Sequence, residues 1–128
     1  MTEAAPAVRY ADDLTREDVL ALEAFLYDRL APLREAAGDI GETSHALRSL
    51  ENLVCDSAGL LLVLLERGRL DRQERRTVQH EWNRLRSTAS WWHYLDGYDT
   101  ARWTRLEYAD AEDETEHRAR IAEAQADR

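Results

Sequence analysis

The chain has 128 residues, of which 44% are hydrophobic and 34% charged, and it contains only five glycines and two prolines. This composition is typical of an all-α domain and argues against a β-sandwich, which needs many more turn-forming residues. The formal net charge is -9, so the field of the whole protein repels anionic membranes and phosphate backbones, and nucleic acid could bind only through a local patch of arginines.

Cysteine content and hydropathy limit the bonds, metal sites and membrane segments that the chain could form. Cys55 is the only cysteine, which excludes an intrachain disulfide and a zinc site built from several cysteines. The most apolar run, residues 58–65, is far shorter than the roughly 20 residues of a membrane-spanning helix. The first residues also lack the apolar run of a secretion signal. We therefore expect a cytoplasmic protein with no membrane segment and no cofactor.

Helical periodicity predicts an all-α fold, an antiparallel up-down four-helix bundle, because the connections between the periodic segments are short. The helices are expected at about residues 16–37, 43–67, 72–95 and 100–125. They form one predicted domain, residues 15–128, whose C-terminal end frays. Residues 1–14 precede the first periodic pattern and are expected to form a flexible N-terminal tail.

The first two predicted helices have recognisable start signals. Thr15 and Asp18 have the spacing of a capping box, in which each side chain accepts a hydrogen bond from the other residue's backbone N–H. Thr43 or Ser44 is expected to cap the second helix. Pro32 lies inside the first pattern, so a kink or a break is expected there. The leucine-rich half of the second helix is apolar around much of its circumference, which predicts a position at the centre of the fold.

The third predicted helix, which Asp71 and Glu74 begin as a second capping box, has an apolar seam. Its spacings of four and three residues follow a heptad pattern. The seam consists of Val78, Trp82, Leu85, Ala89 and Trp92. This helix is therefore expected to pack against the others along one side.

The opposite face of the third helix carries an unusual set of side chains, which share one side at about 100° of rotation per residue. The set consists of Arg76, His80, Arg84, Trp91 and Tyr94. Tryptophan, tyrosine and arginine are enriched at the energetically important centres of interfaces. We therefore predict that this face binds a protein partner or a second copy of the chain. The alternative is that Trp91 is covered by the acidic last helix or by the N-terminal tail.

Residues 67–86 hold seven arginines and three acidic residues, a local charge of +4 within an acidic chain. This is the patch through which nucleic acid could bind.

A short part of the third helix resembles a known enzyme family. Residues 86–94 read Arg-Ser-Thr-Ala-Ser-Trp-Trp-His-Tyr, which resembles the Arg-x(4–6)-His signature of HEPN-type all-helical ribonucleases. These enzymes often form dimers and cut RNA without metal. The resemblance implies that His93 is the base for a ribose 2′-hydroxyl and that Arg86 stabilises the phosphorane charge. The alternative is structural, with His93 packed at the corner and Arg86 paired with an acid of the last helix.

The fourth predicted helix is polar where it should face the bundle. Its inward stripe includes Asp110, Glu114 and His117. Because buried charges need partners, this helix either leaves the bundle and is partly solvated, or pairs with Arg84 and Arg86, or binds a cation. The first two alternatives are favoured over a metal site, since carboxylates on a charged helix usually serve solubility and pairing.

The sequence thus predicts an acidic, non-enzymatic interaction or regulatory protein, for which no catalytic residue is favoured. The alternative is a HEPN-like dimeric ribonuclease that uses Arg86 and His93.

Overall fold

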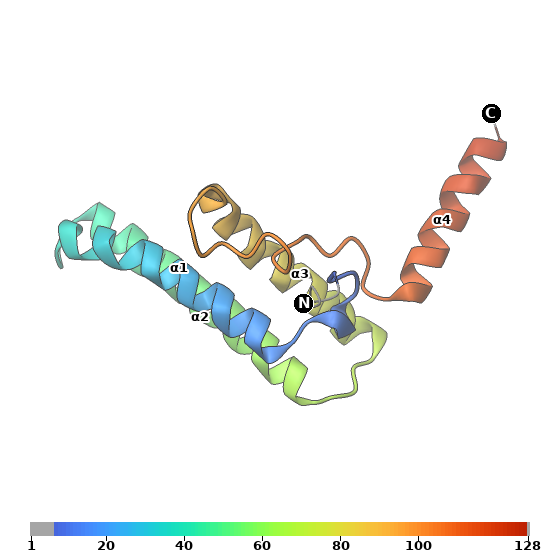
Figure 1. The fold of residues 1–128 in the computed structure, drawn as a ribbon, viewed down its shortest axis with the longest axis horizontal. Helices are drawn as coiled ribbons and strands as arrows, with labels where there is room; N and C mark the ends of the chain where they lie inside the picture. The colour runs from blue at the N-terminus through green and yellow to red at the C-terminus, as the bar shows by residue number, and fades with distance from the viewer. Residues whose placement is uncertain (1–6, 128) are drawn as a thin grey trace, which may run out of the picture.

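The computed structural model describes residues 7–127 and confirms the all-α class, because this part of the chain forms four α-helices and no strand (Figure 1). The helices are α1 (Arg16–Ala37), α2 (Glu42–Glu66), α3 (Arg72–Ala89) and α4 (Ala111–Ala126). Two short 3-10 helices lie at Ala11–Asp13 (η1) and Ser90–Trp92 (η2). None of the described helices is long and apolar enough to cross a membrane.

The capping boxes predicted for α1 and α3 are both confirmed. The Asp18 N–H donates to Thr15 Oγ1 at 3.2 Å, and the Thr15 N–H donates to Asp18 Oδ2 at 2.9 Å. Asp71 and Glu74 form the same reciprocal pair, at 2.8 and 3.1 Å. Each box satisfies N–H groups that have no partner within the helix, so a local signal is sufficient to define these two starts.

The N-cap predicted for α2 and the break predicted in α1 near Pro32 are both wrong. The N-cap of α2 is Gly41 rather than Thr43 or Ser44, and it adopts a positive φ of 106° that glycine tolerates without steric cost. α1 continues through Pro32 to Ala37 without a break. The Asp28 carbonyl, which lacks the N–H of Pro32 as a partner, belongs to an exposed residue where water can replace that bond.

Three helices pack around one core. α2 doubles back after residues 38–41 and lies alongside α1, and α3 packs against both (Figure 1). The seam predicted for α3 is confirmed as far as Ala89, since Val78, Trp82 and Ala89 are fully buried and Leu85 nearly so. Its last predicted member, Trp92, lies in η2 and is half-buried against the core.

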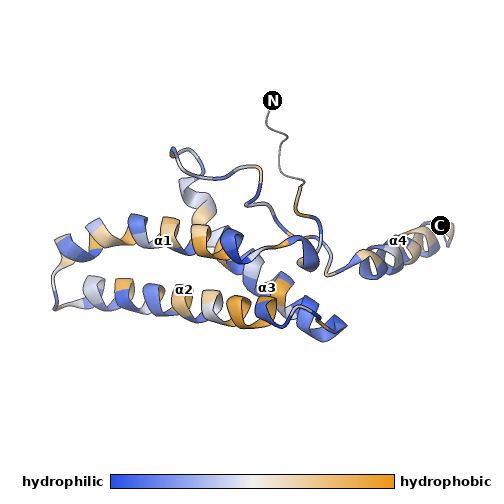
Figure 2. Cartoon of the chain, turned by 60° about the horizontal axis from the view of Figure 1, so that its bottom comes forward, coloured by the Kyte–Doolittle hydropathy of each residue, from blue (hydrophilic) through white to orange (hydrophobic). Residues whose placement is uncertain are grey.

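Hydrophobic residues of α2 gather in its second half (Figure 2), where Ala58, Leu61 and Leu64 are buried. Leu60 and Val63 on the same half are 41% and 53% exposed, so this half is not surrounded by the fold as predicted.

Residues 7–14 pack against the helices, although the sequence places them in the flexible tail. Val8, Ala11 and Leu14 are buried, and the Ala11 N–H donates to the Ala109 carbonyl at 3.1 Å. The rest of the predicted tail, residues 1–6, lies outside the described residues. The contact with Ala109 joins the N-terminal segment to the chain just before α4.

The α-helix predicted at 72–95 ends at Ala89 and continues only as η2 to Trp92. The fourth helix, predicted from residue 100, begins at Ala111. The Asp99 carboxylate does accept from the N–H groups of Ala101 and Arg102, but this turn ends near residue 103. Residues 104–109, called here the connecting segment, are not helical.

The connecting segment binds α3 through its backbone, which explains why it does not form a helix. The Trp82 indole N–H donates to the Thr104 carbonyl at 2.9 Å. Asn83 donates to the Leu106 carbonyl at 2.9 Å and accepts from the Leu106 N–H at 2.8 Å. A buried indole N–H and a half-buried amide need such partners, and a helical segment would use its own backbone groups internally.

α4 does not pack with the other three helices, so the four-helix bundle is not confirmed. Within residues 7–127, no Cα atom of α4 lies within 8 Å of a Cα atom in another helix. The helix extends away from the rest of the fold (Figure 1), and none of its described residues is buried. The inward stripe predicted for the fourth helix therefore faces no bundle.

Candidate functional site

All five residues predicted to bind a partner are exposed. They are Arg76, His80, Arg84, Trp91 and Tyr94. Trp91 is 79% exposed and Tyr94 is 70% exposed, so neither α4 nor the described part of the N-terminal segment covers Trp91. We call these five residues the α3 face.

The α3 face has two parts because the α-helix ends before its aromatic residues. Trp91 lies in η2 and Tyr94 follows it, whereas the three basic residues lie on α3 itself. Ser90 Oγ donates to the Ser87 carbonyl at 2.6 Å, which satisfies one of the carbonyls that an ending helix leaves without a partner. We call the three basic residues, Arg76, His80 and Arg84, the basic row. The aromatic residues therefore lie at a corner of the chain, beyond the end of the basic row.

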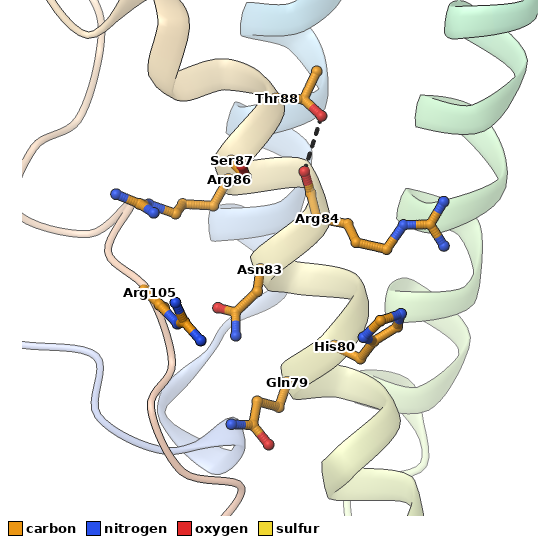
Figure 3. A pocket seen from close by; sticks show the side chains of 8 residues that line it. All are labelled: Gln79, His80, Asn83, Arg84, Arg86, Ser87, Thr88 and Arg105. Carbon is orange, nitrogen blue, oxygen red and sulfur yellow. Dashed lines mark hydrogen bonds between the residues drawn. The ribbon is translucent and has the colours of Figure 1, made fainter.

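A hollow of about 660 Å³ lies beside the basic row of α3 (Figure 3). In the close view, the side chains of His80 and Arg84 extend from one side of α3, and those of Arg86 and Arg105 lie on the other side. The residues that line the hollow are Gln79, His80, Asn83, Arg84, Arg86, Ser87, Thr88 and Arg105. Three are arginines and none is acidic. The hollow is therefore a basic site on an acidic protein.

The connecting segment brings Arg105 to this hollow. Its backbone is bound to α3 on both sides of Arg105, through Trp82 to Thr104 and through Asn83 to Leu106. Leu106 is buried and Arg105 is exposed. These bonds thus place Arg105 on the same side of α3 as Arg86, whereas Arg84 extends from the other side (Figure 3).

The arginines of the hollow have few charged partners. Among residues 7–127, neither Arg86 nor Arg105 forms an ion pair with a carboxylate. The Nε of Arg86 donates to the Trp103 carbonyl at 3.4 Å, and Arg84 Nη1 lies 3.6 Å from Glu81 Oε1. The hollow therefore retains guanidinium groups that can bind an external anion.

The acids of α4 pair with arginines, but not with Arg84 and Arg86 as one alternative proposed. Because α4 begins at Ala111, its first turns lie near the start of α3. Arg72 Nη2 lies 2.5 Å from Glu116 Oε2. This leaves the arginines of the hollow without the partners that the sequence suggested.

Two of the three candidate cation ligands, Asp110 and Glu114, form other interactions. The Asp110 side chain caps α4 by accepting from the Asp113 N–H at 2.7 Å. Glu114 accepts from the Tyr10 hydroxyl at 2.8 Å and lies 2.8 Å from Arg9 Nη2. The hydrogen bond from Tyr10 lowers the pKa of Glu114. His117 is exposed. Within the described part of the chain, no group of three or more histidine, cysteine, aspartate or glutamate side chains could hold a metal ion.

Arg86 and His93 are not brought together in the hollow. Arg86 lines it, whereas His93 does not. His93 is exposed, and its Nδ1 lies 2.9 Å from the Ser90 carbonyl oxygen. Because α3 ends at Ala89, the two residues do not share one continuous helical face.

Arg105 is the site residue that the sequence did not reveal. The periodic pattern placed it inside the fourth helix, where it had no relation to α3. The available signal was Asn83, because an amide beside an apolar seam needs a bonding partner and thus indicates that backbone packs there.

Comparisons of the chain with protein-family models, with curated proteins and with solved structures found no match.

Proposed function

We propose that this protein is a non-enzymatic interaction module that binds a protein partner, or a second copy of itself, through the α3 face. The observation that carries the proposal is the exposure of Trp91 and Tyr94, at 79% and 70%, next to a row of basic residues. Burying apolar surface contributes roughly 25 cal/mol per Å², and a large aromatic side chain has much of it to bury. Tryptophan, tyrosine and arginine also dominate the binding energy of many interfaces.

Other exposed apolar residues support the choice of the α3 face by contrast. Leu53, Leu60 and Val63 of α2 are about half exposed, and Ile40 is 88% exposed in the turn before α2. These side chains are aliphatic, and aliphatic residues on a surface are common without any function. Among residues 7–127, the α3 face combines exposed aromatic rings with exposed basic side chains.

The test compares Trp91→Ala with Ile40→Ala, which removes an exposed apolar side chain elsewhere. Sedimentation velocity over a wide concentration range measures self-association of the full chain. We expect wild type and Ile40→Ala to associate alike and Trp91→Ala to associate at least about tenfold more weakly, the loss of a modest hot spot.

If the wild type is monomeric, a photo-crosslinking residue in place of Tyr94 captures the partner in cells, and the purified partner is then titrated against the same variants. Equal affinity of wild type, Trp91→Ala and Tyr94→Ala for that partner would refute the proposal.

A second candidate function is a metal-independent ribonuclease that uses Arg86 and His93. One observation favours it, namely that Arg86 lines a basic hollow and forms no ion pair with a described residue. Single-stranded RNA incubated with wild type, Arg86→Ala and His93→Ala in the presence of a chelator provides the test. Cleavage that either substitution abolishes would support the ribonuclease, and equal products from all three proteins would refute it.

A further inference from the structure

We propose that the hollow beside α3 binds a phosphate group carried on a side chain of the protein partner. The inference rests on the proposed function, because it specifies the chemistry of a segment that lies across the α3 face. Among the residues that line the hollow, Arg86 and Arg105 lie on the same side of α3, whereas Arg84 extends from the other side (Figure 3). The proposed phosphate site is therefore the part of the hollow between Arg86 and Arg105.

The charge of the hollow favours a doubly charged oxyanion over a single carboxylate. One arginine can bind a carboxylate with two parallel hydrogen bonds, so the two arginines Arg86 and Arg105 exceed what one aspartate or glutamate needs. A phosphorylated side chain carries a charge of about -1.5 to -2 and three acceptor oxygens. Arginines from two segments that meet at one hollow match such a group in both charge and number of donors.

The carboxylates near the hollow determine which of its arginines keep an uncompensated positive charge. Glu81 lies 3.6 Å from Arg84 and partly compensates it. Arg105 also borders a second, smaller hollow that contains Glu107 and Asp113, yet neither carboxylate lies within ion-pair distance of it. The net positive charge in the first hollow therefore comes mainly from Arg86 and Arg105.

Because the positive charge is confined to the hollow of an acidic protein, a phosphorylated protein is favoured over RNA as its ligand. The chain has a net charge of -9, so a nucleic acid that extends beyond the hollow passes over a repulsive field. A single phosphate on a peptide places its charge only where the arginines lie. The flanking peptide residues can then reach the α3 face, whose His80 and Arg84 also line the hollow.

The experiment uses the full chain and three probes at constant ionic strength: inorganic phosphate, a short neutral peptide with one phosphoserine, and the same peptide with serine. NMR shifts of the arginine Nε–Hε groups report binding. We expect saturable binding of phosphate and of the phosphopeptide, with shifts at Arg86 and Arg105, and no binding of the serine peptide.

Charge-matched variants test whether the hollow is the site. We expect Arg105→Gln to weaken phosphopeptide binding at least about tenfold, because it removes a charged, bidentate donor. Arg120→Gln changes the net charge equally at an exposed position of α4 and should change the affinity about twofold or less, since charges beyond a Debye length are screened. Arg105→Lys keeps the charge without the planar donor pair and should give intermediate affinity.

Three outcomes would overturn the inference. They are no saturable phosphate binding, an equal loss of affinity in Arg120→Gln and Arg105→Gln, and tighter binding of a short oligoribonucleotide than of the phosphopeptide. The proposed function is separable from this result. If a dephosphorylated partner binds as tightly as before and Trp91→Ala still abolishes its binding, the α3 face is an interface but the phosphate site is not.

Discussion

Replacing Arg102 with alanine tests the most deeply buried ion pair of the described fold. Arg102 Nε and Nη2 donate to the two carboxylate oxygens of Asp18 at 3.0 and 2.5 Å, and the two side chains are 13% and 8% exposed. The pair connects the turn at residues 99–103 to the start of α1. Its loss would leave a buried carboxylate without its charged partner.

The expected cost is about 3 kcal/mol in the free energy of unfolding. Removal of one partner from a buried ion pair typically costs about 3 to 5 kcal/mol. The lower value applies because Asp18 keeps the hydrogen bonds from the N–H and hydroxyl of Thr15. For a domain of this size such a loss lowers Tm by about 10 °C. Urea unfolding followed by circular dichroism at pH 7 measures it.

The loss of stability in Arg102→Ala should be largest near neutral pH and should decrease as the pH falls. Burial alone would raise the pKa of Asp18, but hydrogen bonds from Arg102 and Thr15 outweigh it and lower the pKa below its ordinary value of 3.8. The pair therefore contributes fully above the pKa of the unfolded chain, and its contribution is lost as the pH falls through the lower folded pKa. The difference between wild type and Arg102→Ala should accordingly shrink at acid pH.

Arg16→Ala is the matched control. Arg16 pairs with Glu66 at 2.5 Å, but their side chains are 53% and 64% exposed, so its removal should cost about 0.5 kcal/mol or less. A loss below about 1 kcal/mol for Arg102→Ala at pH 7, or a loss that stays constant into the acid range, would refute the reasoning about the buried pair.

Three further results are expected. Asn83→Ala should cost about 2 kcal/mol and speed amide exchange at Leu106, because it leaves a buried N–H without its acceptor; urea unfolding that matches wild type would contradict this. Glu114→Gln should shift the raised pKa of Tyr10 back toward its ordinary value, since the bond to Glu114 is the main cause of that rise; NMR titration of the Tyr10 ring measures it, and an unchanged pKa would contradict it. Trp91→Ala should change the free energy of unfolding by less than about 0.5 kcal/mol, because its side chain is exposed; a larger loss would show that Trp91 supports the fold.

The sequence by itself determined those features that depend on neighbours within a few residues along the chain. The boxes at Thr15 and Asp71 start two helices because the groups that satisfy the first N–H donors lie three residues away. The seam of α3 is equally local, since its spacing sets which side must be buried. The exposure of the basic row follows from that seam by rotation alone, whereas Trp91 lies in η2, beyond the end of the α-helix.

Only the tertiary structure determined the conformation of the chain after residue 97. The pattern at residues 100–125 has the periodicity of a helix, but Trp82 and Asn83 require backbone partners that a helical segment cannot supply. Those long-range bonds make residues 104–109 irregular, delay α4 until Ala111 and place Arg105 beside Arg86. The basic hollow is therefore a product of packing between two distant segments, which no local pattern in the sequence encodes.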